Sequence, residues 1–188
     1  MLKNHKVGFS IVEVMTVIAI IAVLVALALP SFNDYFEKAR LRGAADSLVG
    51  LLAQSRSEAV KRNRQTVVTK VGGGAVWCVG ATIAADPSNV GDPLPAAVPC
   101  DCSDGTPSCS LGTISSTDAR GVTAGANAFE VTFNPKYGGS EGFVSPTTSF
   151  TSQSGRFDLS VRASSTGQAR ICRTAGSGTI YGYMECES

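Results

Sequence analysis

The feature that most constrains this chain is a long apolar run near its N-terminus. Phe9–Leu29 is a run of 21 positions, of which only three, Glu13 among them, are polar. As an α-helix, a run of this length extends about 30 Å, which matches the hydrocarbon core of a bilayer. Because Lys3 and Lys6 precede it, the positive-inside rule predicts a single span with the N-terminus in the cytoplasm and the remaining chain outside.

Glu13 is the residue that a plain membrane anchor does not explain. A carboxylate inside a spanning helix costs about 2.5–3.5 kcal/mol on insertion scales and usually marks a partner. A removable secretory signal is also a poor fit, because Leu29-Pro30-Ser31 is not a small-residue cleavage site. Two explanations remain. The Glu13 side chain could extend to the membrane–water interface, or the helix could have a second role in which Glu13 binds a partner.

The stretch Gly8-Phe9-Ser10-Ile11-Val12-Glu13 resembles the signal of type IV pilins and type II secretion pseudopilins. The resemblance implies that a prepilin peptidase removes the leader, residues 1–8, after Gly8 and that Phe9 becomes the methylated N-terminus. Glu13 then corresponds to the family's glutamate at the fifth mature position. Pro30 corresponds to the proline at which the pilin helix bends or melts, and residues 9–30 to the transmembrane and assembly helix.

This resemblance gives Glu13 a physical role. Cleavage would create a positive amine on Phe9, and in a filament the Glu13 carboxylate of one subunit could pair with the amine of a neighbour. In a low-dielectric core such a pair is strong, and an unpaired member is heavily penalised. Glu13 is therefore expected to set the register of assembly. The expected partners are other minor pilins and the major pilin, through the N-terminal helix, after a stage in the inner membrane.

The remaining chain, residues 31–188, is expected to form a periplasmic globular domain of α+β class, in which the helix packs on an antiparallel β-sheet. Residues 31–64 carry small and apolar side chains at three- and four-residue spacing, which predicts an amphipathic helix ending near Asn63. Residues 65–188 carry strand-like alternation around a long loop, 84–128. The helix stripe consists of Leu41, Ala44, Ala45, Leu48, Leu52, Ser55 and Ala59. The expected strands are Thr66–Val71, Ala75–Val79, Phe129–Phe133, Phe157–Arg162, Ala169–Arg173 and Thr179–Met184.

All six cysteines lie beyond the apolar run, which predicts three disulfides in an oxidising compartment. We favour Cys172 with Cys186, because that bridge would staple the C-terminus. Proximity then suggests Cys102 with Cys109 and Cys78 with Cys100, out of 15 connectivities that six cysteines allow. A zinc site is the rival interpretation, but the Cys-x-Cys spacing is imperfect for zinc, so we expect no metal.

Charge is uneven along the chain although its formal net value is only +1. Residues 31–70 carry eight Lys/Arg and four acidic residues, and residues 71–155 carry two Lys/Arg and seven acidic residues. Residues 156–188 carry four Lys/Arg and three acidic residues. An anion-binding face would therefore be built from the first helix and the C-terminal strands. The chain's one histidine lies at position 5, before the apolar run. The usual general base is thus missing from the globular domain, and we expect neither an enzyme nor a cofactor.

A second resemblance narrows the family. Residues 53–63, AQSRSEAVKRN, resemble the helix end of the GspH/FimT group of minor pilins and pseudopilins, and residues 167–172 resemble its closing strand. The resemblance implies a minor pilin incorporated into a type IV pilus fibre, at the tip or priming complex, where it supports assembly. The alternative is a pseudopilin of the type II protein secretion system.

A third alternative is DNA binding in natural transformation. Relatives that bind DNA use a Gly-Arg-x-Arg-like motif near the C-terminus, but here Gln168 replaces the first arginine. Arg162, Arg170 and Arg173 remain as candidates for phosphate contacts.

Overall fold

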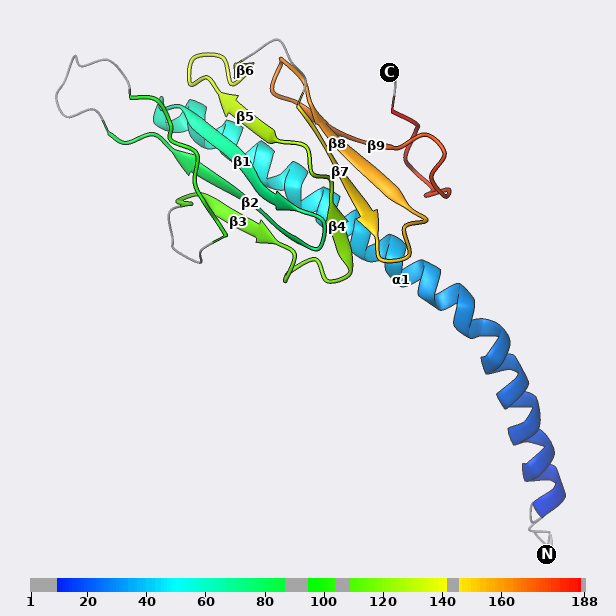
Figure 1. Cartoon of the computed structure of the whole chain (residues 1–188). Helices are drawn as coiled ribbons and strands as arrows, with labels where there is room; N and C mark the ends of the chain where they lie inside the picture. Colours follow the sequence, from blue (N-terminus) through cyan, green and yellow to red (C-terminus); the bar gives the residue numbers. More distant parts are fainter. Residues whose placement is uncertain (1–9, 87–94, 104–108, 142–145, 187–188) are drawn as a thin grey trace, which may run out of the picture. The chain divides into compact units, whose positions relative to one another are not determined.

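The computed structural model describes residues 10–86, 95–103, 109–141 and 146–186, without the side chains of 27–31 and 141. The chain forms two compact units, Met1–Phe36 and Glu37–Ser188. The fold is α+β, with one long helix, α1 (Ile11–Arg62), followed by antiparallel β-sheets (Figure 1).

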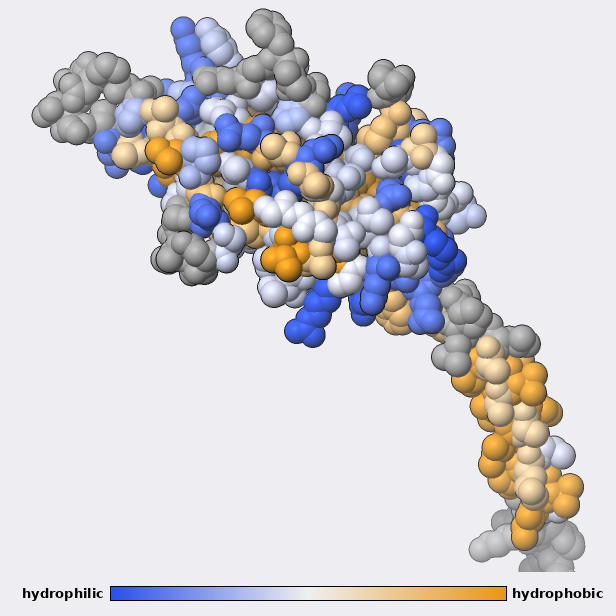
Figure 2. Space-filling view, in the orientation of Figure 1, coloured by the Kyte–Doolittle hydropathy of each residue, from blue (hydrophilic) through white to orange (hydrophobic). Residues whose placement is uncertain are grey.

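The first unit contains the N-terminal part of α1. Its large apolar side chains from Ile11 to Val25 are each at least 47% exposed, and Figure 2 shows this apolar surface. Among the residues whose side chains are described, no helical stretch combines the length and the apolarity needed to cross a membrane. The predicted span, Phe9–Leu29, extends beyond those residues at both ends. The helix continues through Pro30, so this proline does not melt it, although it supplies no N–H for the helical ladder.

In the second unit, α1 buries the face that the sequence predicted. All seven residues of the expected stripe are buried, each at most 3% exposed. The helix ends where expected, since Asn63 adopts a left-handed conformation with φ of 50°. The N–H of Arg64 donates to the carbonyl of Ala59 at 3.1 Å, which satisfies a carbonyl of the last turn.

The strands form two antiparallel sheets rather than the one predicted. The first sheet has the order β3-β2-β1-β5-β6 and the second the order β4-β7-β8-β9. The first sheet comprises β1 (Thr66–Gly73), β2 (Val76–Ile83), β3 (Gly112–Ser115), β5 (Phe129–Phe133) and β6 (Ser140–Glu141). The second comprises β4 (Val122–Ala124), β7 (Thr147–Ser152), β8 (Asp158–Ala163) and β9 (Ala169–Arg173).

Two further expectations about strands were wrong. The predicted loop 84–128 contains β3 and β4, which tertiary pairing stabilises although their own sequence signal is weak. Thr179–Met184 is not a strand: Gly182 has a φ of 92°, which breaks an extended run. Directly after this segment, the chain meets β9 in a single parallel bridge, between Arg173 and Glu185.

The described core lies entirely within the second unit. Every buried apolar side chain lies at Leu41 or later, and the cluster joins α1 to strands of both sheets. Trp77 of β2 packs on Phe150 of β7, with ring centroids 5.0 Å apart, and its Nε1 donates to the Val122 carbonyl at 3.0 Å. A fragment of residues 31–188 therefore retains all of this core.

Candidate functional site

The predicted processing site lies outside the described residues, since Gly8 and Phe9 precede them. Glu13 lies in the first turn of α1, and its side chain is exposed. The Thr16 hydroxyl donates to the backbone carbonyl of Glu13 at 2.9 Å, a bond that does not involve the Glu13 carboxylate. The first turn of a helix favours a negative charge, so a carboxylate is electrostatically suited to this position.

Three exposed aromatic residues follow the apolar run in the same unit. Phe32, Tyr35 and Phe36 are 58%, 65% and 54% exposed. The rings of Tyr35 and Phe36 meet edge to face, with centroids 5.8 Å apart. Sequence reasoning treated these positions only as part of a helix. Their exposure adds an aromatic band to the apolar surface of α1, and such a surface needs a partner.

The disulfides correct the pairing that proximity suggested. Cys172 is bonded to Cys186, as favoured, but Cys78 is bonded to Cys102 and Cys100 to Cys109. All six cysteines are thus used, and none is free to ligate zinc.

The physical reason for the correction lies on one face of β2. Residues 78 and 80 point to the same face because side chains alternate along a strand. Cys102 reaches Cys78, and the sulfurs of Cys100 and Cys109 lie over Gly80, where a Cβ would collide with both. The absent side chain of Gly80 creates the space for the second bridge, which no spacing rule could show.

The structure brings together two of the three candidate DNA-binding arginines. Arg162 of β8 and Arg170 of β9 are cross-strand partners, so their side chains leave the sheet on one face. Arg173 is an odd number of positions from Arg170 and points to the other face. It forms a salt bridge with Glu185 and donates to the Ser177 carbonyl at 2.9 Å, so its charge is already partly neutralised.

The C-terminal segment lies along the edge of β9. The Arg173 N–H donates to the Met184 carbonyl at 2.7 Å, and the Cys186 N–H donates to the Arg173 carbonyl at 2.9 Å. Tyr183 packs against the core, and Arg42 of α1 donates to the Tyr181 carbonyl at 3.0 Å. This segment therefore occupies one part of the β9 edge.

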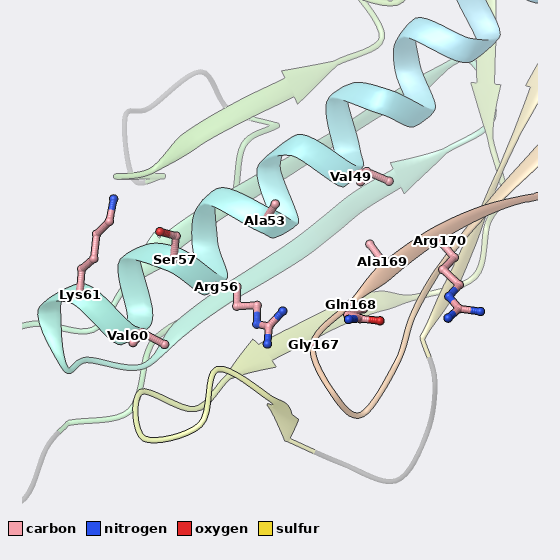
Figure 3. A pocket seen from close by; sticks show the side chains of 10 residues that line it. All are labelled: Val49, Ala53, Arg56, Ser57, Val60, Lys61, Gly167, Gln168, Ala169 and Arg170. Carbon is pink, nitrogen blue, oxygen red and sulfur yellow. The ribbon is translucent and has the colours of Figure 1, made fainter.

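A groove of about 620 Å³ lies between α1 and the start of β9. Figure 3 shows its two walls, one from α1 and one from the β8–β9 turn and β9. The residues that line it are Val49, Ala53, Arg56, Ser57, Val60, Lys61, Gly167, Gln168, Ala169 and Arg170. Four of these ten residues have aliphatic side chains, three are cationic, and none is acidic. The groove is built from the two regions to which the charge distribution assigned an anion-binding face.

Arg56 is the central cation of this groove, and it is half-buried. The Arg56 Nε lies close to two glycines: a Cβ added to Gly138 would stand 3.1 Å from it, and a Cβ added to Gly167 would stand 3.2 Å from it. Both glycines have positive φ, 61° and 77°, so these turns admit the guanidinium without strain. The sequence alone indicated only a solvent-exposed residue at the helix end. It could not show that Arg56 is half-buried, because the turns that surround it are distant in sequence.

The other cations of the helix end have partners. Arg62 donates to Glu58 at 2.7 Å, and Lys61 lies 3.6 Å from the same carboxylate. The hydrogen bond from Arg62, aided by both positive charges, lowers the pKa of Glu58 below its usual value. Arg64 pairs with Asp86. Among the described residues, neither Arg56 nor Arg170 forms a salt bridge.

Comparison with known proteins gives the family. The model of the family described as "Type II transport protein GspH" matches residues 44–180. The chain belongs to the GspH family. A second model, the prokaryotic N-terminal methylation motif, matches residues 4–29. For this GspH-family chain, the match adds independent support to the expected leader and N-terminal helix.

Individual relatives match shorter parts of the GspH-family chain. A fimbrial protein of Moraxella nonliquefaciens is 39% identical over 62 residues, covering 33% of this chain and 37% of the relative. The fimbrial protein EcpC of Eikenella corrodens is 46% identical over 44 residues, covering 23% and 29%. The chain thus spans about a third of the length of these relatives. A crystal structure of the type IV minor pilin FimU from Pseudomonas aeruginosa is similar with a TM-score of 0.45 and 18% identity, over 70% of this chain and 91% of that one.

Proposed function

We propose that the chain is a minor pilin, a structural rather than catalytic protein, that is built into a type IV pilus at or near the tip. The observation that carries this proposal is the apolar surface of α1 from Ile11 to Val25, which the chain itself leaves exposed. Such a surface requires a bilayer or a bundle of neighbouring helices. The methylation motif supports the same sequence of events, first an inner-membrane anchor and then a subunit of the fibre.

The proposed processing divides the chain into the leader 1–8, the assembly helix 9–30 and the periplasmic domain 31–188. Gly8→Leu should leave an unprocessed precursor, because a bulky side chain would block prepilin peptidase. Mass spectrometry of the N-terminus distinguishes the precursor from a chain that begins with methylated Phe9. Normal processing of the variant would refute the leader assignment.

Glu13 tests the assembly role. Glu13→Ala should insert into the membrane normally and be incorporated into sheared pili at a level reduced at least tenfold. An unpaired Phe9 amine in the fibre core would carry a large desolvation penalty. Glu13→Asp is the matched control that keeps the charge and should retain part of the incorporation. Wild-type incorporation of Glu13→Ala would contradict the proposed register role.

A pseudopilin role in type II secretion is the second candidate, because the family description names type II transport. The two machines can be separated genetically. A deletion of the gene should abolish surface pili and leave secretion of exoproteins unchanged if the chain is a pilin. The reverse result would assign the chain to the secretion system.

DNA binding is a third candidate, favoured by the cross-strand pair Arg162 and Arg170. The fragment 31–188 should retard duplex DNA at low salt and release it as salt rises. The double variant Arg162→Gln with Arg170→Gln should weaken binding, whereas Arg173→Gln should change it little, because Arg173 is bonded to Glu185. Absence of binding at low salt would reject this candidate.

A further inference from the structure

The β9 strand has an open edge beside the groove. Just beyond the β8–β9 ladder, the Ser164 N–H donates to the Gln168 carbonyl at 2.8 Å, so Ser164 and Gln168 form a hydrogen-bonded pair. The pairs Arg162–Arg170 and Ser160–Cys172 follow at intervals of two residues along both strands. In an antiparallel pair, hydrogen-bonded positions alternate. The backbone groups of even-numbered β9 residues therefore face β8, and those of Ala169 and Ile171 face away from it.

The chain's own C-terminus confirms this direction. Arg173 has the same parity as Ala169 and Ile171, and its N–H and carbonyl are hydrogen-bonded to Met184 and Cys186. Within the described ranges, nothing is hydrogen-bonded to Ala169 or Ile171 on that side. One part of the edge thus already holds an extended segment, and the adjoining part does not.

The groove supplies side-chain chemistry at this open part of the edge. Val49, Ala53 and Val60 of α1 offer aliphatic contacts, and Arg56 offers positive charge on the side of α1. Arg170 leaves β9 on the opposite face, with Arg162, and offers positive charge on the other side of the edge (Figure 3). A ligand that satisfies all of these groups has free backbone N–H and C=O groups, aliphatic side chains and carboxylates. An extended acidic peptide segment fits this description, and it would add a strand to the sheet.

We propose that the β9 edge at Ala169 and Ile171, with the adjoining α1 groove, binds an extended segment of a neighbouring subunit that carries alternating aliphatic and acidic side chains. A nucleic acid backbone fits less well, because none of the residues that line the groove is aromatic, so a base would have no ring on which to stack. The assignment of the segment to a neighbouring subunit rests on the proposed pilin function. The chemistry of the site is independent of that proposal.

The test uses the full-length, ¹⁵N-labelled chain in detergent micelles and capped octapeptides as probes. The main probe alternates valine and glutamate. Its controls alternate valine with lysine, which reverses the charge, and serine with glutamate, which removes the aliphatic contacts. A short DNA duplex is the fourth probe. Amide hydrogen exchange, read by NMR, reports which backbone groups become bonded.

The valine–glutamate peptide should bind at least tenfold more tightly than either control peptide. It should slow exchange of the Ala169 and Ile171 amides and leave that of Arg170 unchanged, because the Arg170 amide is already bonded to β8. Arg56→Gln and Arg170→Gln should each weaken binding about three- to tenfold. Arg120→Gln, an exposed arginine outside the groove, should leave affinity unchanged.

A backbone variant tests strand addition directly. Ala169→Pro removes an N–H that does not serve the β8 ladder, and proline is tolerated on such an edge. This variant should abolish protection at Ile171 and weaken binding at least tenfold. If it fails to fold, the two arginine variants carry the test alone.

Three outcomes would overturn the proposal: no binding at millimolar peptide, equal binding of the valine–lysine peptide, or binding that leaves exchange at Ala169 and Ile171 unchanged. A stronger response of these amides to the DNA duplex would assign the site to phosphate instead. Peptide binding in vitro does not depend on the machine into which the chain is built. A gene deletion that leaves surface pili unchanged would therefore refute the pilin function without affecting this site, whereas failure of peptide binding would leave the pilin function untouched.

Discussion

Gly80→Ala is a direct test of the disulfide arrangement on β2. The residue lies on the fully paired part of the strand, opposite Thr69 and Thr113. A methyl group there would collide with the sulfurs of Cys100 and Cys109 and would stand 3.3 Å from the Cβ of Cys109. Because the obstacle is a crosslink rather than a flexible side chain, the bridge must either move or open.

The expected loss of stability can be worked out for both cases. Alanine in place of glycine at a tolerated position stabilises a fold by about 0.4–1 kcal/mol. Overpacking costs about 1–3 kcal/mol. Opening a bridge with a sequence separation of 9 costs roughly 2.7 kcal/mol in loop-closure entropy. The net decrease in the free energy of unfolding is then up to about 2.6 kcal/mol if the bridge moves and about 1.7–2.3 kcal/mol if it opens.

Urea unfolding of the fragment 31–188 measures this change. Trp77 is the chain's one tryptophan and is 2% exposed, so its fluorescence reports unfolding. Gly43→Ala is the matched control: its Cβ would meet nothing within 4 Å on the exposed face of α1, and it should stabilise the fold by about 1 kcal/mol. Equal stabilisation by both changes would refute the position of the bridge over Gly80.

The same fragment allows the bridges to be mapped. A protease that cleaves before aspartate separates Cys100, Cys102 and Cys109, because Asp101 and Asp104 lie between them. Unreduced digestion should link peptide 46–85 to 101–103 and peptide 92–100 to 104–117. Links from 46–85 to 92–100 and from 101–103 to 104–117 would restore the pairing that proximity suggested.

Three other changes have defined outcomes. Trp77→Phe should lower the free energy of unfolding by about 1–3 kcal/mol in urea titrations followed by circular dichroism, because the buried Val122 carbonyl loses its donor. Cys172→Ser with Cys186→Ser should lower it by about 3 kcal/mol, since the bridge closes a loop with a separation of 14; an unchanged midpoint would show that the other contacts suffice. Burial lowers the pKa of Lys70 below 10.5, so the unfolded chain binds more protons between the two pKa values and stability should rise with pH across that window. Lys70→Met should abolish the rise, and a slope equal to that of the wild type would exclude Lys70 as its source.

The helical half of the fold was readable from the sequence. The spacing of residues from Leu41 to Ala59 specified the buried face of α1, and Asn63 marked its end, because helix periodicity and a left-handed cap are local properties. The hairpin of β1 and β2 and the alternation of β5 were visible for the same reason.

The strands β3 and β4 were not predictable, because they are short and stabilised by partners distant in sequence. The bridge between Cys100 and Cys109 depends on space above Gly80, and the half-buried position of Arg56 depends on the turns at Gly138 and Gly167. Each of these features arises where segments meet that are far apart in the chain.

The sequence alone determined the exposed apolar helix, the candidate leader before Phe9 and the position of Glu13, since each rests on the order of neighbouring residues. Only the tertiary structure decided the division of the strands into two sheets, the connectivity of two disulfides and the pairing of Arg162 with Arg170. It also created the groove between α1 and β9. The physical reason is that strand register, disulfide geometry and grooves depend on distances between segments that are not adjacent in the chain. Those distances are set by tertiary packing and cannot be read from the order of neighbouring residues.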